Sequence, residues 1–334
     1  MRVAVLGAGS WGTALGLVLA RNGNDVTLWS HDAELARAIR NDGRNPRYLV
    51  DVELPAAVEA TADMDEALAG AGVVVSAVPS HAVREVAAAA RPHIADDGLL
   101  ISGSKGIEIA TGSRMSEVLE SELGADAAHD LVVFSGPSFA LELARGLPTA
   151  VAAASRSSEA AEACQALFQN EHLRVYTHRD VVGTELGGSL KNVMALAAGI
   201  SDGLGLGSNA RAALLTRGLA EMARLAVELG AEEHTLSGLA GVGDLILTCT
   251  SDLSRNRRAG LAIGRGASLD EALEQVRMVV EGAPTTRAAR DLALTHGVEM
   301  PIVGAVYSIL FEEVGPRQAL AELMAREPKP ERWS

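Results

Sequence analysis

The chain has 334 residues, of which 48% are hydrophobic and 22% are charged, a composition typical of globular proteins and long enough for two domains. Its net charge of −14 argues against a nucleic-acid or anionic-membrane partner, because both bind a basic face. No apolar stretch is long enough to span a bilayer, and the first one, Val3–Leu6, is too short for a signal-peptide core. The two cysteines, Cys164 and Cys249, lie in no CxxC or Cys/His cluster, so we expect a cytoplasmic protein without a structural metal.

The first half of the chain alternates short β-branched segments with alanine-rich, helix-like segments such as Thr13–Asn22 and His81–Arg91. The early strand candidates are almost continuously apolar, as strands covered on both faces should be. The alternation predicts an α/β fold, a Rossmann-type doubly wound, mostly parallel sheet. The predicted strands are Arg2–Leu6, Val26–Trp29, Val73–Val78, Leu99–Ser102, Leu131–Ser135, Ala150–Ala154 and Leu173–Tyr176.

After about Thr184 the strand patterns stop and only helical patterns follow, separated by glycine and polar breaks. We therefore expect a dinucleotide-binding domain over 1–184 and an all-helical, substrate-binding and catalytic domain over 185–334. The predicted helices of this second domain are Glu185–Ala198, Ala210–Leu229, Ala240–Thr248, Ser254–Ile263, Ser268–Val276, Thr285–His296 and Pro301–Phe311.

A GxGxxG motif follows the first strand directly and opens the first helix, which is the setting that a dinucleotide-binding βαβ unit requires. Gly7 permits the tight turn, Gly9 lets the backbone approach a pyrophosphate, and Gly12 lets the helix pack on the strand. The helix N-terminus offers free N–H groups and a partial positive charge to the phosphates. The sequence therefore predicts an NAD or NADP site here.

The end of the second strand bears on the choice between the two cofactors. An NAD-selective site places Asp or Glu about 20 residues after the motif, where it binds the ribose 2′-hydroxyl. Here Ser30 and His31 occupy that place and Asp32 falls just past it. A hydroxyl and an imidazole can donate to a 2′-phosphate. We expect both cofactors to work, with NADPH preferred; the alternative for His31 is an ordinary surface position.

Lysine is scarce in this chain. Of the 29 basic residues, 26 are Arg and only Lys105, Lys191 and Lys329 are Lys. Arg stays protonated in proteins, whereas the pKa of Lys can be tuned by its surroundings. The two lysines within the body of the chain are therefore candidates for proton transfer, and Lys329 lies in a tail that we expect to be solvated.

Lys191 lies beside the apolar stripe of a predicted helix, and Gly187 and Gly188 precede it on the same face. Two glycines inside a helix cost about 1 kcal/mol each relative to alanine, so we expect a ligand to approach this bare surface. The alternative is a solvated lysine at the helix edge.

Other candidates follow the ends of predicted strands, where ligands bind in such sheets. Lys105 follows one strand, and the loop SGPSFA at 135–140 follows the next and can offer backbone N–H groups. Asp244, after two glycines, is either a site residue or a helix N-cap. Three arginines within 255–258, with Asn256 among them, form either a phosphate site or a solvated basic face.

These segments together resemble the bacterial-type NAD(P)-dependent glycerol-3-phosphate dehydrogenase family. The resemblance runs over nearly the whole chain in the family's order. The matching stretches are GAGSWGTALG at 7–16, SKGIE at 104–108, SGPSFALELARGLPTA at 135–150, ELGGSLKNVMALAAGISDGLGLGSNARAALLTRG at 185–218, GVGDLILTCTSDLSRNRR at 241–258 and VVEG at 279–282.

The resemblance implies interconversion of dihydroxyacetone phosphate and sn-glycerol 3-phosphate by hydride transfer, which supplies phospholipid synthesis. It implies Lys191 as the proton donor and acceptor. The implied cofactor contacts, besides the glycines, are Ser10, Trp11, His31, Lys105, Ala140, Arg255, Val279 and Glu281. The implied substrate contacts are Lys105, Gly136, Ser138, Lys191, Asp244, Ser254, Arg255 and Asn256. We expect a homodimer that binds a small phosphorylated molecule, with no nucleic acid and no insertion into a membrane.

Two other functions remain open at this point. A β-hydroxyacid dehydrogenase also joins a Rossmann domain to a helical domain with a catalytic lysine, but it has no need of the arginine cluster at 255–258. A non-catalytic NADH-sensing regulator has no use for a tuned lysine and needs a DNA-binding module, of which the sequence shows no sign.

Overall fold

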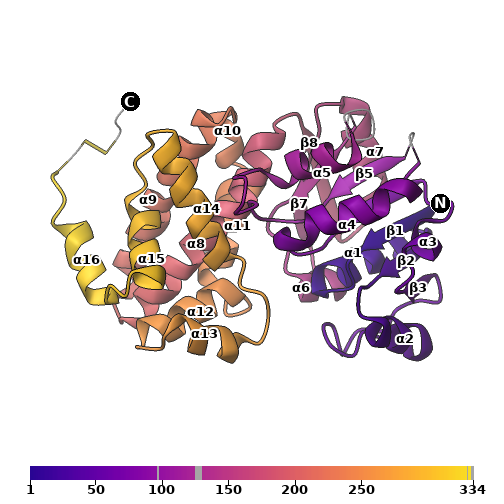
Figure 1. Ribbon diagram of the computed structural model, residues 1–334, viewed down its shortest axis with the longest axis horizontal. Helices are drawn as coiled ribbons and strands as arrows, with labels where there is room; N and C mark the ends of the chain where they lie inside the picture. Colours follow the sequence, from indigo (N-terminus) through magenta and orange to yellow (C-terminus); the bar gives the residue numbers. More distant parts are fainter. Residues whose placement is uncertain (96–97, 125–129, 329, 332–334) are drawn as a thin grey trace.

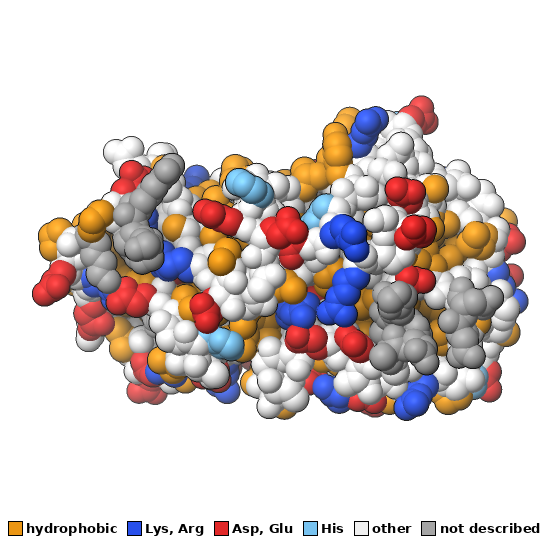
Figure 2. Space-filling view, turned by 90° about the horizontal axis from the view of Figure 1, so that it is seen from above, with side chains coloured by type: hydrophobic (Ala, Val, Ile, Leu, Met, Phe, Trp, Pro, Cys, Tyr) orange, Lys and Arg blue, Asp and Glu red, His pale blue; other side chains and the backbone are white. Residues whose placement is uncertain are grey.

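The computed structural model describes residues 1–95, 98–124, 130–328 and 330–331. Figure 1 shows two parts side by side, an α/β part over the first half of the chain and a helical part over the second. No helix within these described ranges is both long and apolar enough to cross a membrane. Figure 2 shows acidic and basic side chains interspersed over one face of the molecule.

Eight strands form one sheet in the order β3-β2-β1-β4-β5-β6-β7-β8. Neighbouring strands are parallel except β6 and β7, which are antiparallel. The order reverses between β1 and β4, which is where ligands bind in open α/β sheets. The strands are β1 (Arg2–Leu6), β2 (Asp25–Trp29), β3 (Val58–Thr61), β4 (Val73–Ser76), β5 (Leu99–Ser102), β6 (Val132–Ser135), β7 (Thr149–Ala154) and β8 (Leu173–His178).

Helices cover both faces of this sheet, because its strands alternate two apolar sets. Val3 and Val5 of β1 pack with one group of helices, whereas Ala4 and Leu6 pack with the other. The first group is α1 (Ser10–Arg21), α2 (Ala33–Asp42), α6 (Ala140–Ala144) and α7 (Ser158–Phe168). The second is α3 (Met64–Leu68), α4 (Val83–Ala90) and α5 (Met115–Leu123), with short 3-10 turns at Ser80–Ala82 and Arg91–His93. The prediction of a doubly wound, mostly parallel sheet is confirmed.

A second core surrounds the long helix α8 (Val181–Gly203), which contributes buried residues along almost its whole length. It begins four residues before the predicted start at 185, because Asp180 accepts a hydrogen bond from the Gly183 N–H and caps it. The other elements of this part are α9 (Gly207–Glu228), α10 (Glu233–Leu236), a π-helical turn (Leu239–Gly243), α11 (Asp244–Thr250), α12 (Arg255–Gly264), α13 (Leu269–Val276), α14 (Gly282–Thr295), α15 (Pro301–Phe311) and α16 (Pro316–Met324).

Candidate active site

The glycine turn after β1 has the geometry that its sequence predicts. Gly7 has φ +116°, and a Cβ there would lie 2.8 Å from the Ala77 carbonyl oxygen. A Cβ on Gly12 would lie 1.8 Å from the Gly7 oxygen, so only glycine lets α1 approach the turn. Gly9, in contrast, faces open space within 4 Å, and α1 has no side-chain cap on its first N–H groups. An open cradle beside uncapped N–H groups suits the pyrophosphate of a dinucleotide.

Ser10 and Trp11 begin α1 and are partly buried. The Trp11 indole N–H donates to the Gly103 carbonyl oxygen at 3.1 Å and so ties the glycine turn to the loop after β5. That loop carries Lys105. Trp11 thus lies between the two sites that the sequence predicts.

The residues after β2 have distinct surroundings. Ser30 is buried and His31 is exposed. Asp32 caps α2, since its Oδ1 accepts hydrogen bonds from the N–H groups of Glu34 and Leu35, and its Oδ2 pairs with Arg47 Nη1 at 2.8 Å. Asp32 is therefore engaged by protein groups on both oxygens.

Two lysines meet at one buried carboxylate, at the junction of the two parts. Lys105 Nζ lies 2.8 Å from Asp244 Oδ2, and Lys191 Nζ lies 2.5 Å from Asp244 Oδ1. Lys105 comes from the loop after β5, Lys191 from α8 and Asp244 from the start of α11. The side chain of Asp244 is 1% exposed, that of Lys191 9% and that of Lys105 20%.

Burial and neighbouring charges tune these groups. Burial, the largest influence, lowers the pKa of Lys191; Asp244 raises it and Lys105 lowers it again, so that it lies at about 8. Burial alone would raise the pKa of Asp244, but the two ammonium groups outweigh it and hold that pKa below its ordinary value. Asp244 thus stays ionised, while Lys191 can gain or lose a proton near neutral pH.

The two glycines before Lys191 are needed for contacts within the protein. A Cβ on Gly187 would lie 2.4 Å from the Ala240 carbonyl oxygen, in the π-helical turn that leads into Asp244. A Cβ on Gly188 would lie 2.7 Å from Ser135 Oγ. These close approaches within the protein account for the two glycines, and the expectation that a ligand also approaches this surface stays a prediction. Backbone and side chains of the site itself approach it, and this approach brings α11 against α8.

Sequence reasoning missed Thr248. Its hydroxyl accepts a hydrogen bond from Lys191 Nζ at 2.9 Å and donates one to Asp244 Oδ1 at 3.3 Å. Thr248 lies four residues after Asp244 on α11, so that the two share a helix face. This i, i+4 pairing of polar residues in an otherwise apolar segment was the available signal.

The loop after β6 contributes backbone groups. The Gly136 carbonyl oxygen accepts hydrogen bonds from Lys105 Nζ at 3.3 Å and from the Ser138 hydroxyl at 2.9 Å. Ala140 begins α6, whose first N–H groups have no side-chain cap. The buried Ser135 hydroxyl has no hydrogen-bond partner among the residues that the structure describes.

At the start of α12, the side chains of Ser254, Asn256 and Arg257 make contacts within the protein. Ser254 caps the helix, and Arg257 pairs with Asp202 and Asp252. Asn256 donates to Asn192 Oδ1 at 2.9 Å and accepts from the Gly282 N–H at 2.8 Å. The predicted cluster of three arginines does not act as one group, because Arg257 is taken by carboxylates.

Arg255 is largely buried and has electrostatic neighbours from both parts of the chain. Burial is the main cause that lowers the pKa of Arg255, whereas the Glu281 carboxylate raises this pKa. Tyr48 of the α/β part also raises it. Glu281 accepts hydrogen bonds from the Ser80 N–H at 3.2 Å and the Ser80 hydroxyl at 2.6 Å, so it joins α14 to the loop after β4. Val279, two residues earlier, is exposed.

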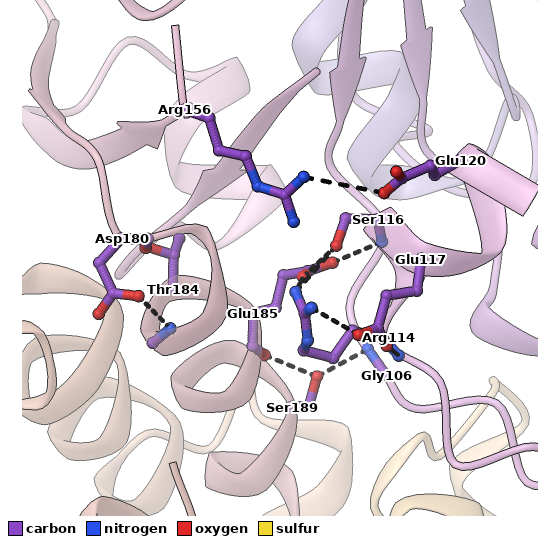
Figure 3. Close-up of polar contacts among 11 residues, drawn as sticks. Gly106, Arg114, Ser116, Glu117, Glu120, Arg156, Asp180, Thr184, Glu185 and Ser189 are labelled. Carbon is purple, nitrogen blue, oxygen red and sulfur yellow. Dashed lines mark hydrogen bonds and ion pairs between the residues drawn. The ribbon is translucent and has the colours of Figure 1, made fainter. Parts of the chain in front are cut away.

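A buried polar junction holds the two parts together (Figure 3). Arg114, which precedes α5, pairs with Glu185 of α8 at 2.5 Å, and the N–H and hydroxyl of Ser116 donate to the same carboxylate at 2.7 and 2.6 Å. One turn along α8, the Ser189 hydroxyl accepts the Gly106 N–H at 3.0 Å. Gly106 follows Lys105, so α8 positions both lysines.

Comparison with known proteins identifies relatives of the whole chain. The family description "NAD-dependent glycerol-3-phosphate dehydrogenase N-terminus" matches residues 2–161, and its C-terminal counterpart matches residues 180–321. A glycerol-3-phosphate dehydrogenase (NAD(P)+) of Pelotomaculum thermopropionicum is 53% identical over 97% of this chain and 93% of that protein. A glycerol-3-phosphate dehydrogenase (NAD(P)+) of Bacillus subtilis is 50% identical over 97% of this chain and 94% of that protein.

Solved structures agree with this. The crystal structure of a glycerol-3-phosphate dehydrogenase from Coxiella burnetii has a TM-score of 0.93 at 44% identity, covering 97% of this chain and 99% of that one. A D-mandelate dehydrogenase in complex with NADH and anilino(oxo)acetate has a TM-score of 0.62 at 13% identity, which shows a shared fold alone.

Proposed function

Because the chain belongs to the NAD-dependent glycerol-3-phosphate dehydrogenase family, we propose that Lys191 exchanges the proton of the reaction with the substrate oxygen. The chain is an NAD(P)-dependent oxidoreductase that interconverts dihydroxyacetone phosphate and sn-glycerol 3-phosphate, which supplies phospholipid synthesis. The reduction consumes dihydroxyacetone phosphate, NAD(P)H and one proton, and yields glycerol 3-phosphate and NAD(P)+. The alternative of a β-hydroxyacid dehydrogenase does not account for the relatives at about 50% identity over the full chain.

Each residue at the lysine pair has a defined part in this proposal. The bound cofactor supplies or accepts the hydride at the substrate's central carbon. Hydride arriving there leaves negative charge on the carbonyl oxygen, and the Lys191 ammonium donates a proton to it; in oxidation the neutral amine takes that proton back. Asp244, ionised and buried, holds both lysines in place, and Lys105 adds a second positive charge beside the oxygen. The observation that carries the proposal is the pairing of both lysines with Asp244.

The phosphate of the substrate needs cationic and N–H donors. We assign it to Arg255, Ser254 and Asn256 at the start of α12, with the substrate completed by Lys105, Gly136 and Ser138. Arg255 supports this because it is partly buried without an ion pair among the described residues, in contrast to Arg257. The dinucleotide is assigned to the glycine turn with Ser10, Trp11, His31, Ala140, Val279 and Glu281, and NADPH is the preferred form.

Lys191→Arg tests the proton-transfer role. Arginine keeps the positive charge but does not give up a proton, so kcat should fall about 10²- to 10⁴-fold. The matched control is Lys329→Arg, the same change at a position outside the described residues, which should leave kcat unchanged. Isothermal titration with NADPH should show that Lys191→Arg still binds the cofactor. Wild-type turnover by a folded Lys191→Arg variant would show that proton transfer lies elsewhere.

The remaining parts of the proposal concern assembly, place and domains. A homodimer is supported by a cavity of about 630 Å³ between α8, α9, α15 and α16, lined by apolar side chains such as Leu214, Ile309 and Leu320. Light scattering of the purified chain measures its mass directly.

A cytoplasmic location is supported by two free, buried cysteines, which suit a reducing compartment. The division into domains at 184/185 stays a prediction.

A further inference from the structure

We infer that Arg47 binds the 2′-phosphate of NADP(H) and so sets the cofactor preference of this chain. The inference rests on the proposed placement of the dinucleotide at the glycine turn. Arg47 lies in the loop that follows α2, outside every motif from which the site was predicted. Its case depends on how that loop is anchored, on what Arg47 contacts and on which of its donors remain available.

The loop that carries Arg47 is fixed to the glycine turn by Asn45. Asn45 is fully buried, and its Nδ2 donates to the Ala8 carbonyl oxygen and to Thr13 Oγ1, both at 2.9 Å. Its Oδ1 accepts the N–H groups of Arg47 at 3.2 Å and Tyr48 at 3.1 Å. One buried amide thus couples the backbone at 47 and 48 to the turn that the dinucleotide is proposed to occupy.

Arg47 reaches the end of β2, where the ribose of a bound dinucleotide is read. The glycine turn adjoins this end, since the Gly7 N–H donates to the Trp29 carbonyl oxygen at 2.9 Å. Arg47 Nη1 lies 2.8 Å from Asp32 Oδ2, and its side chain is 55% exposed. The guanidinium is therefore accessible at the place where NAD-selective proteins present a lone carboxylate.

The surroundings of Asp32 remove the usual obstacle to a 2′-phosphate. A free carboxylate there would repel the phosphate. In this chain the N–H of Leu35 and the guanidinium of Arg47, in that order, hold the pKa of Asp32 below its ordinary value, so its charge is compensated by positive groups. A compensated carboxylate no longer excludes a second anion, and it orients the guanidinium.

Arg47 retains donors for that anion. A guanidinium has five N–H donors in a planar fork, and a phosphate accepts two of them side by side. Among the described residues, Nη1 donates to Asp32, and the Tyr48 side chain is a second hydrogen-bond partner of this guanidinium. Two such partners do not use up five donors, so the fork retains N–H groups for a phosphate. His31, the residue before Asp32, is also exposed.

Two fragments of the cofactor isolate this contact. Adenosine 2′,5′-bisphosphate and adenosine 5′-monophosphate differ only in the 2′-phosphate, and isothermal titration measures the affinity of each without catalysis. Arg47→Gln should weaken the bisphosphate about 10- to 100-fold, the range for a lost charge-assisted hydrogen bond, and leave the monophosphate within about twofold. The ratio of kcat/KM for NADPH to that for NADH should fall with it.

Arg44→Gln is the matched control. Arg44 begins the same loop, is half exposed and pairs with Glu53 instead. The variant should bind both fragments as the wild type does. Asp32→Asn keeps a good helix cap but removes the negative charge, so it should strengthen bisphosphate binding about two- to fivefold.

The outcomes separate this inference from the cofactor site as a whole. Arg47→Gln that weakens both fragments equally shows a role in shaping the loop, and one that weakens neither shows no contact; either result overturns the inference while the dinucleotide site stands. A wild type that binds neither fragment overturns the assignment of the dinucleotide to the glycine turn as well.

Discussion

Lys105 and Lys191 approach opposite oxygens of the Asp244 carboxylate, at 2.8 and 2.5 Å. One lysine belongs to the α/β part and the other to the helical part, so the carboxylate joins the two parts at the point of reaction. Because the Lys105 ammonium disfavours a positive charge on Lys191, the protonation of Lys191 depends on where Lys105 lies. This dependence can be measured.

The pH dependence of the reaction should follow Lys191, whose pKa lies at about 8. Reduction needs the ammonium form, so its kcat/KM should be level at lower pH and fall as pH rises through about 8. Oxidation needs the neutral amine, so its kcat/KM should rise through the same range. Initial rates in both directions between pH 6 and 10, with a fixed buffer ionic strength, check this. If kcat/KM changed in the same direction with pH for both reduction and oxidation, the prediction would be contradicted.

The Lys105→Gln substitution should shift the pH at which kcat/KM changes. Lys105 lowers the pKa of Lys191, so removing its charge should raise this pKa and shift both limbs to higher pH. The variant also loses a substrate contact, which lowers kcat/KM at every pH but does not move a limb. A limb that stays near pH 8 would mean that the titrating group is not Lys191.

Arg255→Ala tests the proposed phosphate site. A charge-assisted hydrogen bond contributes about 1.5–3 kcal/mol, so kcat/KM for dihydroxyacetone phosphate should fall about 10- to 150-fold. The slow reduction of dihydroxyacetone, which has no phosphate, should be unchanged. Arg258→Ala, at an exposed position of the same helix, is the control. Efficient turnover of dihydroxyacetone by the wild type would remove the need for a phosphate site.

The Arg114–Glu185 pair should be important for stability (Figure 3). Removing one partner of a buried ion pair costs about 3–5 kcal/mol, because the other charge stays buried alone. Arg114→Met should therefore lower the free energy of unfolding in urea by about this amount. Changing Glu185→Met as well should recover part of the loss, since no charge is then left unpaired. A double variant less stable than Arg114→Met would contradict this account.

Local sequence predicts the elements whose signal is local. The apolar strands from Arg2–Leu6 to Leu173–His178 and the glycine turn are found with errors of one or two residues. The edge strand β3 was missed, because its four residues include the exposed Glu59 and show no continuous apolar pattern. Helix α16 was missed as well, since only Ala319 is buried along it.

Long-range contacts explain what the site prediction lacked. Gly187 and Gly188 are correctly placed beside Lys191, but their reason is the approach of Ala240 and Ser135, residues 53 positions ahead along the chain and 53 positions before, respectively. The sequence alone does not distinguish Arg257 from the two neighbouring arginines, because its ion pairs with Asp202 and Asp252 appear only in the structure. Arg47 carries no sequence signal at all, because its position depends on the buried amide of Asn45.

The scarcity of lysine has a practical consequence for chemical labelling. Most proteins of this length offer amine-directed reagents many surface lysines, whereas this chain has three, and two of them contact Asp244. An amine with a pKa of about 8 is largely neutral, and hence nucleophilic, in mildly alkaline buffer. Covalent modification of the chain should therefore inactivate it almost in proportion to the label taken up by the two inner lysines. Coupling through amines to a resin would attach the chain by its N-terminus, by Lys329 or by the active site itself.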